Sequence, residues 1–477
     1  MGVEIDRRSI WLLLALRGLR PGFFLLVFGL FWYIVSLPVP DGLTPEAKNA
    51  IAVFLLCLIL WVTNAIPLAI TSILAVVLIP LTGVLPPKET YSLFGNEAVF
   101  FILGAFILAG AVMHSGLSNR IALIIMERFG SSPRSLLLSI FGLAAVLSFV
   151  MSEHAVAAML FPIVLEIAKA LRLRPGRSNY GKLLFLALAW GCVIGGVATF
   201  LGGARVPLAV GILKESTTET IGFLAYTVAV IPLVIVLLAV GAFVLTRVLS
   251  IDIESVESAH EVLQKRIHGM GKVGWSEYSV GTVLVLTIVC WMTLGTTVGL
   301  ATVALASVVV LFIFRLVRWK DIEEYVNWGV ILMYGGAIIL GASLERSGAA
   351  GWLAEMAVGE WVTSPLTAIA FFSLVTLLLT EGISNAAVIA ILLPVGLGLA
   401  GRFEMDPSLV TYSIAVPAGL AFCMPLATPA NAIAVSSSYV SIGDMMKAGV
   451  IMSFTAWVVF NLVARFWWPI IGLGGIG

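Results

Sequence analysis

Charge is scarce in this chain, and its scarcity argues against most soluble protein classes. Only 11% of the 477 residues are charged, whereas 60% are hydrophobic by type and the mean hydropathy is +1.10. A soluble globule is about a quarter charged, so this chain cannot cover itself with a water-compatible surface. The net charge of +1 leaves no basic excess to attract nucleic acid. A soluble enzyme, a disordered protein and a nucleic-acid binder are all disfavoured.

Cysteine is rare as well. The four cysteines lie inside apolar runs without metal-ligand spacing, which is typical of small buried hydrophobic residues. The sequence has no Gly-x-x-x-x-Gly-Lys-Ser/Thr loop, so ATP-driven transport is not indicated. We expect no enzyme activity and no organic cofactor, because no nucleophile–base pair or metal cluster falls at the depth of a membrane span.

Long apolar runs make up most of the chain instead. At about 20 residues per bilayer crossing, the length allows roughly ten to twelve spans, and continuous apolar runs favour helices over a barrel. The hydropathy therefore predicts an all-α polytopic membrane protein with about eleven transmembrane helices. The predicted spans are 21–37, 49–63, 66–84, 98–116, 183–213, 222–248, 278–294, 297–316, 328–344, 411–440 and 448–472.

Two further apolar stretches, 135–172 and 364–400, are interrupted near their midpoints by polar residues. The first is broken at 151–154 (Met-Ser-Glu-His) and the second at 381–385 (Glu-Gly-Ile-Ser-Asn). A polar break in an apolar run suits a re-entrant hairpin, whose irregular tip is tolerated only where it lines a protein cavity. The two stretches therefore predict two re-entrant hairpins.

The basic residues predict the topology. When the N-terminus is placed in the cytoplasm, twenty of the 27 lysines and arginines fall in cytoplasmic segments and six fall outside. This is the bias that the positive-inside rule predicts. The C-terminus then lies outside, the first hairpin opens from the cytoplasm, and the second opens from outside. The remaining basic residue, Arg205, lies at membrane depth.

The hairpins belong to a longer internal repeat. An offset of 232 residues carries Ser152 and Pro162 of the first hairpin onto Ser384 and Pro394 of the second. In many secondary transporters, inverted repeats with broken helices build one site that opens to the two sides alternately. The predicted organisation is an N-terminal segment with the first span (1–48), a first inverted repeat (49–250), a cytoplasmic connector (251–277) and a second inverted repeat (278–477).

Each repeat also contains an interruption after its hairpin. In the second repeat two prolines break the run 424–431, while Thr428 and Asn431 supply side-chain oxygens. With the tip at Ser384 and Asn385, these neutral oxygens suit a weakly held Na⁺. Helix N-termini that start at such breaks present N–H groups to an anion. The alternative is a proline kink in a packed bundle.

The interruption in the first repeat, 195–207, is rich in glycine and contains Arg205. An isolated charge near the bilayer centre costs several kcal/mol, so intramembrane charges usually pair or line a wet pathway. Glu153 at the hairpin tip and Arg205 are therefore predicted to form an ion pair. The pair is either purely structural or, together with His154, part of a transport site.

These residues resemble the divalent anion/sodium symporter family, the carriers of citrate, dicarboxylates and sulfate. The resemblance covers nearly the whole chain and is strongest at 380–385 and 427–433. It implies a homodimer whose protomers each combine a scaffold with a transport part that moves as an elevator. We expect the chain in a bacterial inner membrane, with a small anion as substrate and Na⁺ as coupling ion.

The resemblance also implies site residues. The sodium site of the second repeat would use Thr380, Asn385 and the carbonyls of Ile383 and Ala427. The substrate would lie between the two hairpin tips. The residues that would contact it are Ser152, Glu153, His154, Arg205, Ser384, Asn385, Thr428 and Pro429.

The first sodium site of the family is altered in this chain. Its residues would be Ser148, Met151, Glu153 and Gly202, and the tip reads Ser-Glu-His where the family has Ser-Asn-Thr. Arg205 could supply the charge of a first Na⁺, or Glu153 or His154 could titrate and couple transport to protons. A proton-coupled carrier and a cation-independent exchanger are therefore alternatives to a Na⁺-coupled carrier. An anion channel is an alternative of another class.

Overall fold

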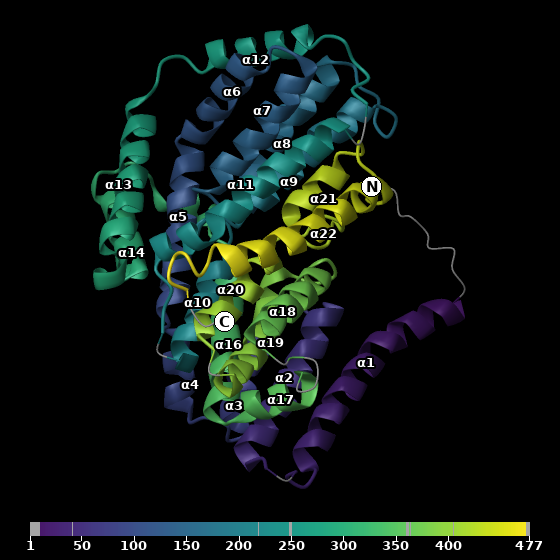
Figure 1. Cartoon of the computed structure of the whole chain (residues 1–477), viewed down its shortest axis with the longest axis vertical. Helices are drawn as coiled ribbons and strands as arrows, with labels where there is room; N and C mark the ends of the chain where they lie inside the picture. Colours follow the sequence, from purple (N-terminus) through teal and green to yellow (C-terminus); the bar gives the residue numbers. More distant parts are fainter. Residues whose placement is uncertain are drawn as a thin grey trace.

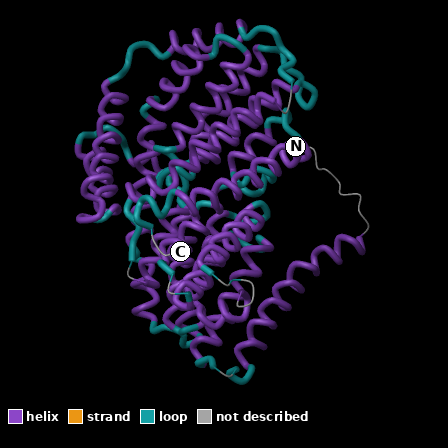
Figure 2. The backbone as a smooth tube through the Cα atoms, in the orientation of Figure 1, coloured by secondary structure: helices purple, strands orange, loops and turns teal. Residues whose placement is uncertain are grey.

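The computed structural model of the chain describes residues 10–473, apart from 41, 218, 248–249, 359–361, 363 and 404. Within these residues the chain forms helices and loops and contains no β-strand (Figure 2). Residues 1–9 of the predicted N-terminal segment and 474–477 of the predicted second repeat lie outside the described residues. The chain is an all-helical membrane protein, as its hydropathy predicts.

Seven helical segments among the described residues are long and apolar enough to cross a membrane. They are α2 (Pro45–Thr63), α4 with α5 (Pro87–Phe94 and Glu97–His114), α9 (Asn179–Gly196), α11 (Phe223–Arg247), α13 (Trp275–Val298), α16 (Trp328–Arg346) and α22 (Ile442–Phe466).

Other apolar helices are shorter or only partly apolar. They include α1 (Ile10–Ser36), α3 (Leu68–Leu81) and α14 (Leu300–Ile313), together with the helices of the two hairpins. Further short elements are α6 (Leu117–Phe129), α12 (Glu257–Gly269), α15 (Trp319–Ile322), η1 (Glu323–Tyr325) and α17 (Ala349–Val358).

Both predicted hairpins are helix pairs broken at their midpoints. The first consists of α7 (Pro133–Ser148) and α8 (Glu153–Ala170), and the second of α18 (Pro365–Thr380) and α19 (Asn385–Arg402). Every bound of the first pair recurs 232 residues later in the second pair. Serine caps both returning helices, because the residue before each one accepts a hydrogen bond from a backbone amide three residues ahead. The helices break at 149–152 and 381–384, which overlaps the breaks predicted at 151–154 and 381–385.

The predicted spans 183–213 and 411–440 are not continuous helices. The first is α9 followed by α10 (Arg205–Thr217), and the second is divided into α20 (Pro407–Ala415), η2 (Pro417–Gly419) and α21 (Pro429–Ser436). Glycine weakens the first span, whereas Pro429 occupies the first position of α21, where a missing N–H costs nothing. Thr428 caps α21 by accepting a 3.2 Å hydrogen bond from the Asn431 amide.

Figure 1 shows how these elements are arranged. Helices α6, α7, α8, α9 and α11 lie together in the upper part of the view, while α2, α3, α16, α18 and α19 lie in the lower part. Helices α13 and α14 form a pair on one flank that packs against α5, and α1 runs along the opposite flank against α2. Residues at the starts of α8, α10, α19 and α21 line one cavity.

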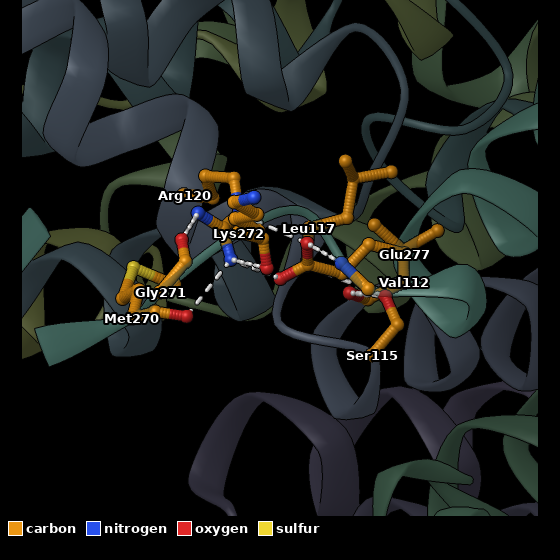
Figure 3. A network of polar contacts seen from close by, with 9 residues as sticks. Val112, Ser115, Leu117, Arg120, Met270, Gly271, Lys272 and Glu277 are labelled. Carbon is orange, nitrogen blue, oxygen red and sulfur yellow. Dashed lines mark hydrogen bonds and ion pairs between the residues drawn. The ribbon is translucent and has the colours of Figure 1, made fainter.

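A buried arginine fastens the predicted connector 251–277 to the helices beneath it (Figure 3). Arg120 of α6 donates to both carboxylate oxygens of Glu277, at 2.9 and 3.1 Å. It also donates to the carbonyls of Met270, Gly271 and Lys272, at 3.2, 2.9 and 3.4 Å. This bidentate, charge-assisted contact fixes the loop after α12 and the start of α13 against α6.

We expect Arg120→Ala to destabilise the fold by about 3–5 kcal/mol, because it leaves the buried Glu277 carboxylate without its cation. Arg128→Ala on the exposed side of the same helix is the matched control and should change little. Thermal unfolding of the two purified variants in detergent measures the difference. Equal melting temperatures would show that the Arg120 contact contributes nothing to stability.

Candidate functional site

A cavity of about 420 Å³ lies where the hairpin tips and the two later breaks meet. A small anion fits a volume of this size. The wall opposite the tips comes from the start of α3 and the first half of α16, at 67–69 and 327–334. The other lining residues are His154, Gly203, Ala204, Arg205, Ser384, Asn385, Ala386, Leu426, Ala427 and Pro429.

Four helices begin at this cavity. Helix α8 starts at Glu153, α10 at Arg205, α19 at Asn385 and α21 at Pro429. The first amides of a helix have no partner within it, and the helix dipole places roughly half a positive charge at this end. The four N-termini therefore give the cavity a positive potential, which favours an anion.

The structure brings most of the predicted substrate residues to this cavity. His154, Arg205, Ser384, Asn385 and Pro429 line it. The other three do not. Ser152 lies at a smaller neighbouring cavity, while the Glu153 and Thr428 side chains are almost fully buried behind the walls.

The predicted ion pair is confirmed. Arg205 Nη1 lies 3.2 Å from Glu153 Oε2, and the two side chains are 3% and 0% exposed. His154 Nδ1 lies 3.9 Å from the other carboxylate oxygen, and half of the His154 side chain is exposed to the cavity. The tip of the first hairpin thus holds a buried carboxylate between a guanidinium and an imidazole.

Oxygens gather at the tip of the second hairpin. Thr380 Oγ1 lies 2.8 Å from both Asn385 Oδ1 and the Ala418 carbonyl oxygen. The hydroxyl has one hydrogen and can donate to only one of these oxygens at a time, so the cluster has a surplus of acceptors. Ile383 stands in the same tip, and Ala427 lines the adjoining cavity. An oxygen-rich cluster of this kind suits a hard monovalent cation.

The corresponding place in the first repeat is arranged differently. The Ser148 hydroxyl is fully buried and has no hydrogen-bond partner among the described residues. The Gly202 carbonyl accepts a 2.9 Å hydrogen bond from the Glu153 backbone amide. Met151 is buried in the tip between them.

Glu381 holds the second tip to the second break. Its carboxylate accepts hydrogen bonds from three consecutive backbone amides, those of Phe422, Cys423 and Met424, at 2.9 to 3.1 Å. It also accepts a 3.1 Å hydrogen bond from the Ser453 hydroxyl of α22. Consecutive backbone amides that point the same way form a binding site for an anion, and here the Glu381 carboxylate of the same chain occupies that site. Glu381 therefore fixes the tip next to Thr380.

Sequence reasoning misses parts of this site. The Ala418 carbonyl has no signature in the sequence, because a backbone oxygen becomes a ligand through the shape of η2 and not through its side chain. The sequence does single out Glu381, because it is a carboxylate inside an apolar run. Its hydrogen-bond partners could not be predicted, because they lie some forty residues away in the chain.

We expect Glu381→Ala to lower stability by about 3–5 kcal/mol, because three amides at membrane depth lose their charged acceptor. Glu345→Ala removes a carboxylate of similar exposure that is not held by such a row of backbone amides, so its effect on stability should be small. Ser453→Ala removes one of the donors and should cost about 1 kcal/mol. Melting temperatures in detergent should be lowest for Glu381→Ala, higher for Ser453→Ala and highest for Glu345→Ala. A Glu381→Ala protein as stable as Glu345→Ala would contradict this role of Glu381.

Comparison with known proteins agrees with the geometry. The profile of the sodium:sulfate symporter transmembrane region matches residues 22–473. The sodium-dependent dicarboxylate transporter SdcS of Staphylococcus saprophyticus is 29% identical, over 93% of this chain and 91% of its own length. SdcS of Staphylococcus aureus is 30% identical, over 91% of this chain and 88% of its own length.

Two solved structures share the fold. The transporter MtrF of Neisseria gonorrhoeae aligns with a TM-score of 0.58 at 13% identity, covering 94% of this chain and 99% of its own. The transporter YdaH of Alcanivorax borkumensis aligns with a TM-score of 0.52 at 15% identity, covering 80% of this chain and 87% of its own.

The family match spans almost the whole chain, and the relatives are transporters and not enzymes. The site agrees with that activity, because it combines an anion-sized cavity with an oxygen cluster and contains helices broken at membrane depth. This chain belongs to the sodium:sulfate symporter family, the divalent anion/sodium symporters.

Proposed function

We propose that this chain is a secondary active transporter that carries a small anion together with Na⁺. The oxygen cluster at Thr380, Asn385 and Ala418 supports this proposal most strongly, because its surplus acceptors call for a cation. The cation site shares Asn385 with the wall of the cavity, so a bound Na⁺ there stabilises a neighbouring anion. This shared residue provides the thermodynamic coupling that symport requires.

The substrate we propose is a dicarboxylate, a tricarboxylate or a sulfate-like anion. Four helix N-termini favour negative charge in the cavity, and Ser384 offers a hydroxyl donor beside them. Relatives at about 30% identity are named for sodium-dependent dicarboxylate transport, which makes dicarboxylates the first to test.

The proposed mechanism is alternating access by an elevator movement of the two hairpins and the later breaks. The recurrence of the hairpin bounds at a fixed offset supports two repeats, 49–250 and 278–477, joined by the connector 251–277. The distribution of basic residues supports a cytoplasmic N-terminus and an external C-terminus. The family resemblance supports a homodimer, and the staphylococcal relatives support a bacterial inner membrane.

A proton-coupled carrier is the second candidate, because His154 lines the cavity beside the Glu153 carboxylate. Uptake of labelled succinate, citrate and sulfate into proteoliposomes separates the candidates when Na⁺ and H⁺ gradients are imposed one at a time. We expect accumulation driven by Na⁺. Accumulation driven by protons alone would assign coupling to the first tip, and exchange only with preloaded anion would identify an exchanger. Current that does not saturate would indicate a channel.

Asn385→Ala should raise the Na⁺ concentration for half-maximal uptake by roughly tenfold, because it removes one oxygen worth on the order of 1–2 kcal/mol from the cation site. The matched control is Asn49→Ala, which removes a half-buried asparagine that donates to the Thr82 carbonyl far from the tips. Uptake of labelled succinate over a range of Na⁺ concentrations gives both values. A wild-type Na⁺ response in Asn385→Ala would place the cation site elsewhere.

A further inference from the structure

The two repeats place different groups at equivalent positions. Ser148 and Thr380 end the outgoing helices of their hairpins, and Glu153 and Asn385 begin the returning ones. In the second repeat these positions contribute oxygens to the proposed cation site. If the first repeat bound a cation in the same way, its site would lie between Ser148 and Glu153.

In the first repeat, a positively charged side chain lies next to the Glu153 carboxylate. The Arg205 guanidinium lies 3.2 Å from the Glu153 carboxylate, and neither side chain has more than 3% of its surface exposed. Arg205 comes from the first residue of α10, which begins at the break of the same repeat. The first repeat thus pairs its carboxylate with a guanidinium.

Three glycines form the slot that holds the guanidinium. A Cβ added at Gly203 would collide with Arg205 Nη1, and one at Gly196 would collide with Glu153 Oε2. A Cβ at Gly419, in η2 of the second repeat, would collide with Arg205 Nε. The side chain is therefore enclosed on several sides by backbone, and both repeats contribute to the enclosure.

The backbone oxygens of the two repeats also differ. The Gly202 carbonyl is engaged by the Glu153 amide at 2.9 Å. At the equivalent point of the second repeat, just before α21, the Ala427 carbonyl accepts no backbone hydrogen bond from the Asn385 amide among the described residues. The carbonyl of the second repeat is therefore free to face a cation, whereas that of the first is already used.

The Glu153–Arg205 pair cannot exchange with solvent ions during transport. Both charges are buried, so separating them would leave two unpaired charges at membrane depth. The pair also neutralises itself, which leaves no net negative charge at the first hairpin tip to attract a free cation.

We infer that the Arg205 guanidinium takes the place of a coupling ion in the first repeat, so that each protomer binds a single Na⁺, in its second repeat. This inference rests on the proposed function and specifies its stoichiometry. The transporter would move one Na⁺ per anion, and a substrate with two negative charges would cross with a net charge of −1.

Binding of labelled Na⁺ to the purified full-length protein tests the inference without knowledge of the substrate. We expect binding to saturate at one Na⁺ per protomer. In a separate uptake assay, we expect a Hill coefficient of about 1 for Na⁺-driven succinate uptake. Two ions per protomer would overturn the inference and leave the proposed function intact. No bound Na⁺ would overturn both.

The double variant Glu153→Asn/Arg205→Ala tests the role of the guanidinium directly. The variant places an asparagine at the first hairpin tip, as Asn385 is at the second, and it removes the guanidinium. We therefore expect Na⁺ binding to saturate at two ions per protomer. The matched control is Glu97→Asn/Lys214→Ala, which removes a half-exposed 2.7 Å ion pair that also involves α10. The control should still bind one Na⁺.

A melting temperature and elution profile like those of the control establish that the double variant is folded. A folded double variant that still binds one Na⁺ would show that the guanidinium does not occupy the position of an ion. Arg205→Lys supplies a further readout, because it keeps the charge and loses the shape of the guanidinium. It should bind one Na⁺, like the wild type.

Discussion

Every backbone amide and carbonyl at membrane depth needs a hydrogen-bond partner, yet this chain breaks its helices there at four places. The structure meets the requirement with side chains from within the breaks. Ser152, Ser384 and Thr428 each cap the helix that follows, and the Thr199 hydroxyl donates to the Phe149 carbonyl at 2.6 Å. Residues of the same breaks line the cavity, so the breaks and the candidate ligand site coincide.

The carboxylates at the two hairpin tips illustrate different solutions to the same electrostatic problem. Glu153 is compensated by a guanidinium, whereas Glu381 is compensated by a row of backbone amides and a hydroxyl. Amides stabilise a negative charge without cancelling it. The second repeat therefore keeps a net negative charge next to the Thr380 cluster, and the first does not. The two halves share a helix pattern but have different electrostatics.

The sequence is enough to predict most of the fold, because apolar runs and their polar interruptions are local signals. The breaks at 151–154 and 381–385 and the pairing of Glu153 with Arg205 follow from the cost of polar groups in a membrane. Distant backbone contacts are different. Nothing in the sequence around η2 indicates that the Ala418 carbonyl faces Thr380, or that the neighbouring glycine faces Arg205. Such contacts arise from the packing of segments more than thirty residues apart.

The glycine at 419 links the two halves of the chain. Any side chain at this position would occupy the volume that Arg205 Nε now fills, although the two residues belong to different halves of the chain. Glycine at 419 is therefore what allows the backbone of η2 to approach the guanidinium this closely. A larger residue at 419 would force the arginine side chain to move. Relatives with a bulkier residue at 419 should lack the arginine, and the two positions should vary together through the lineage.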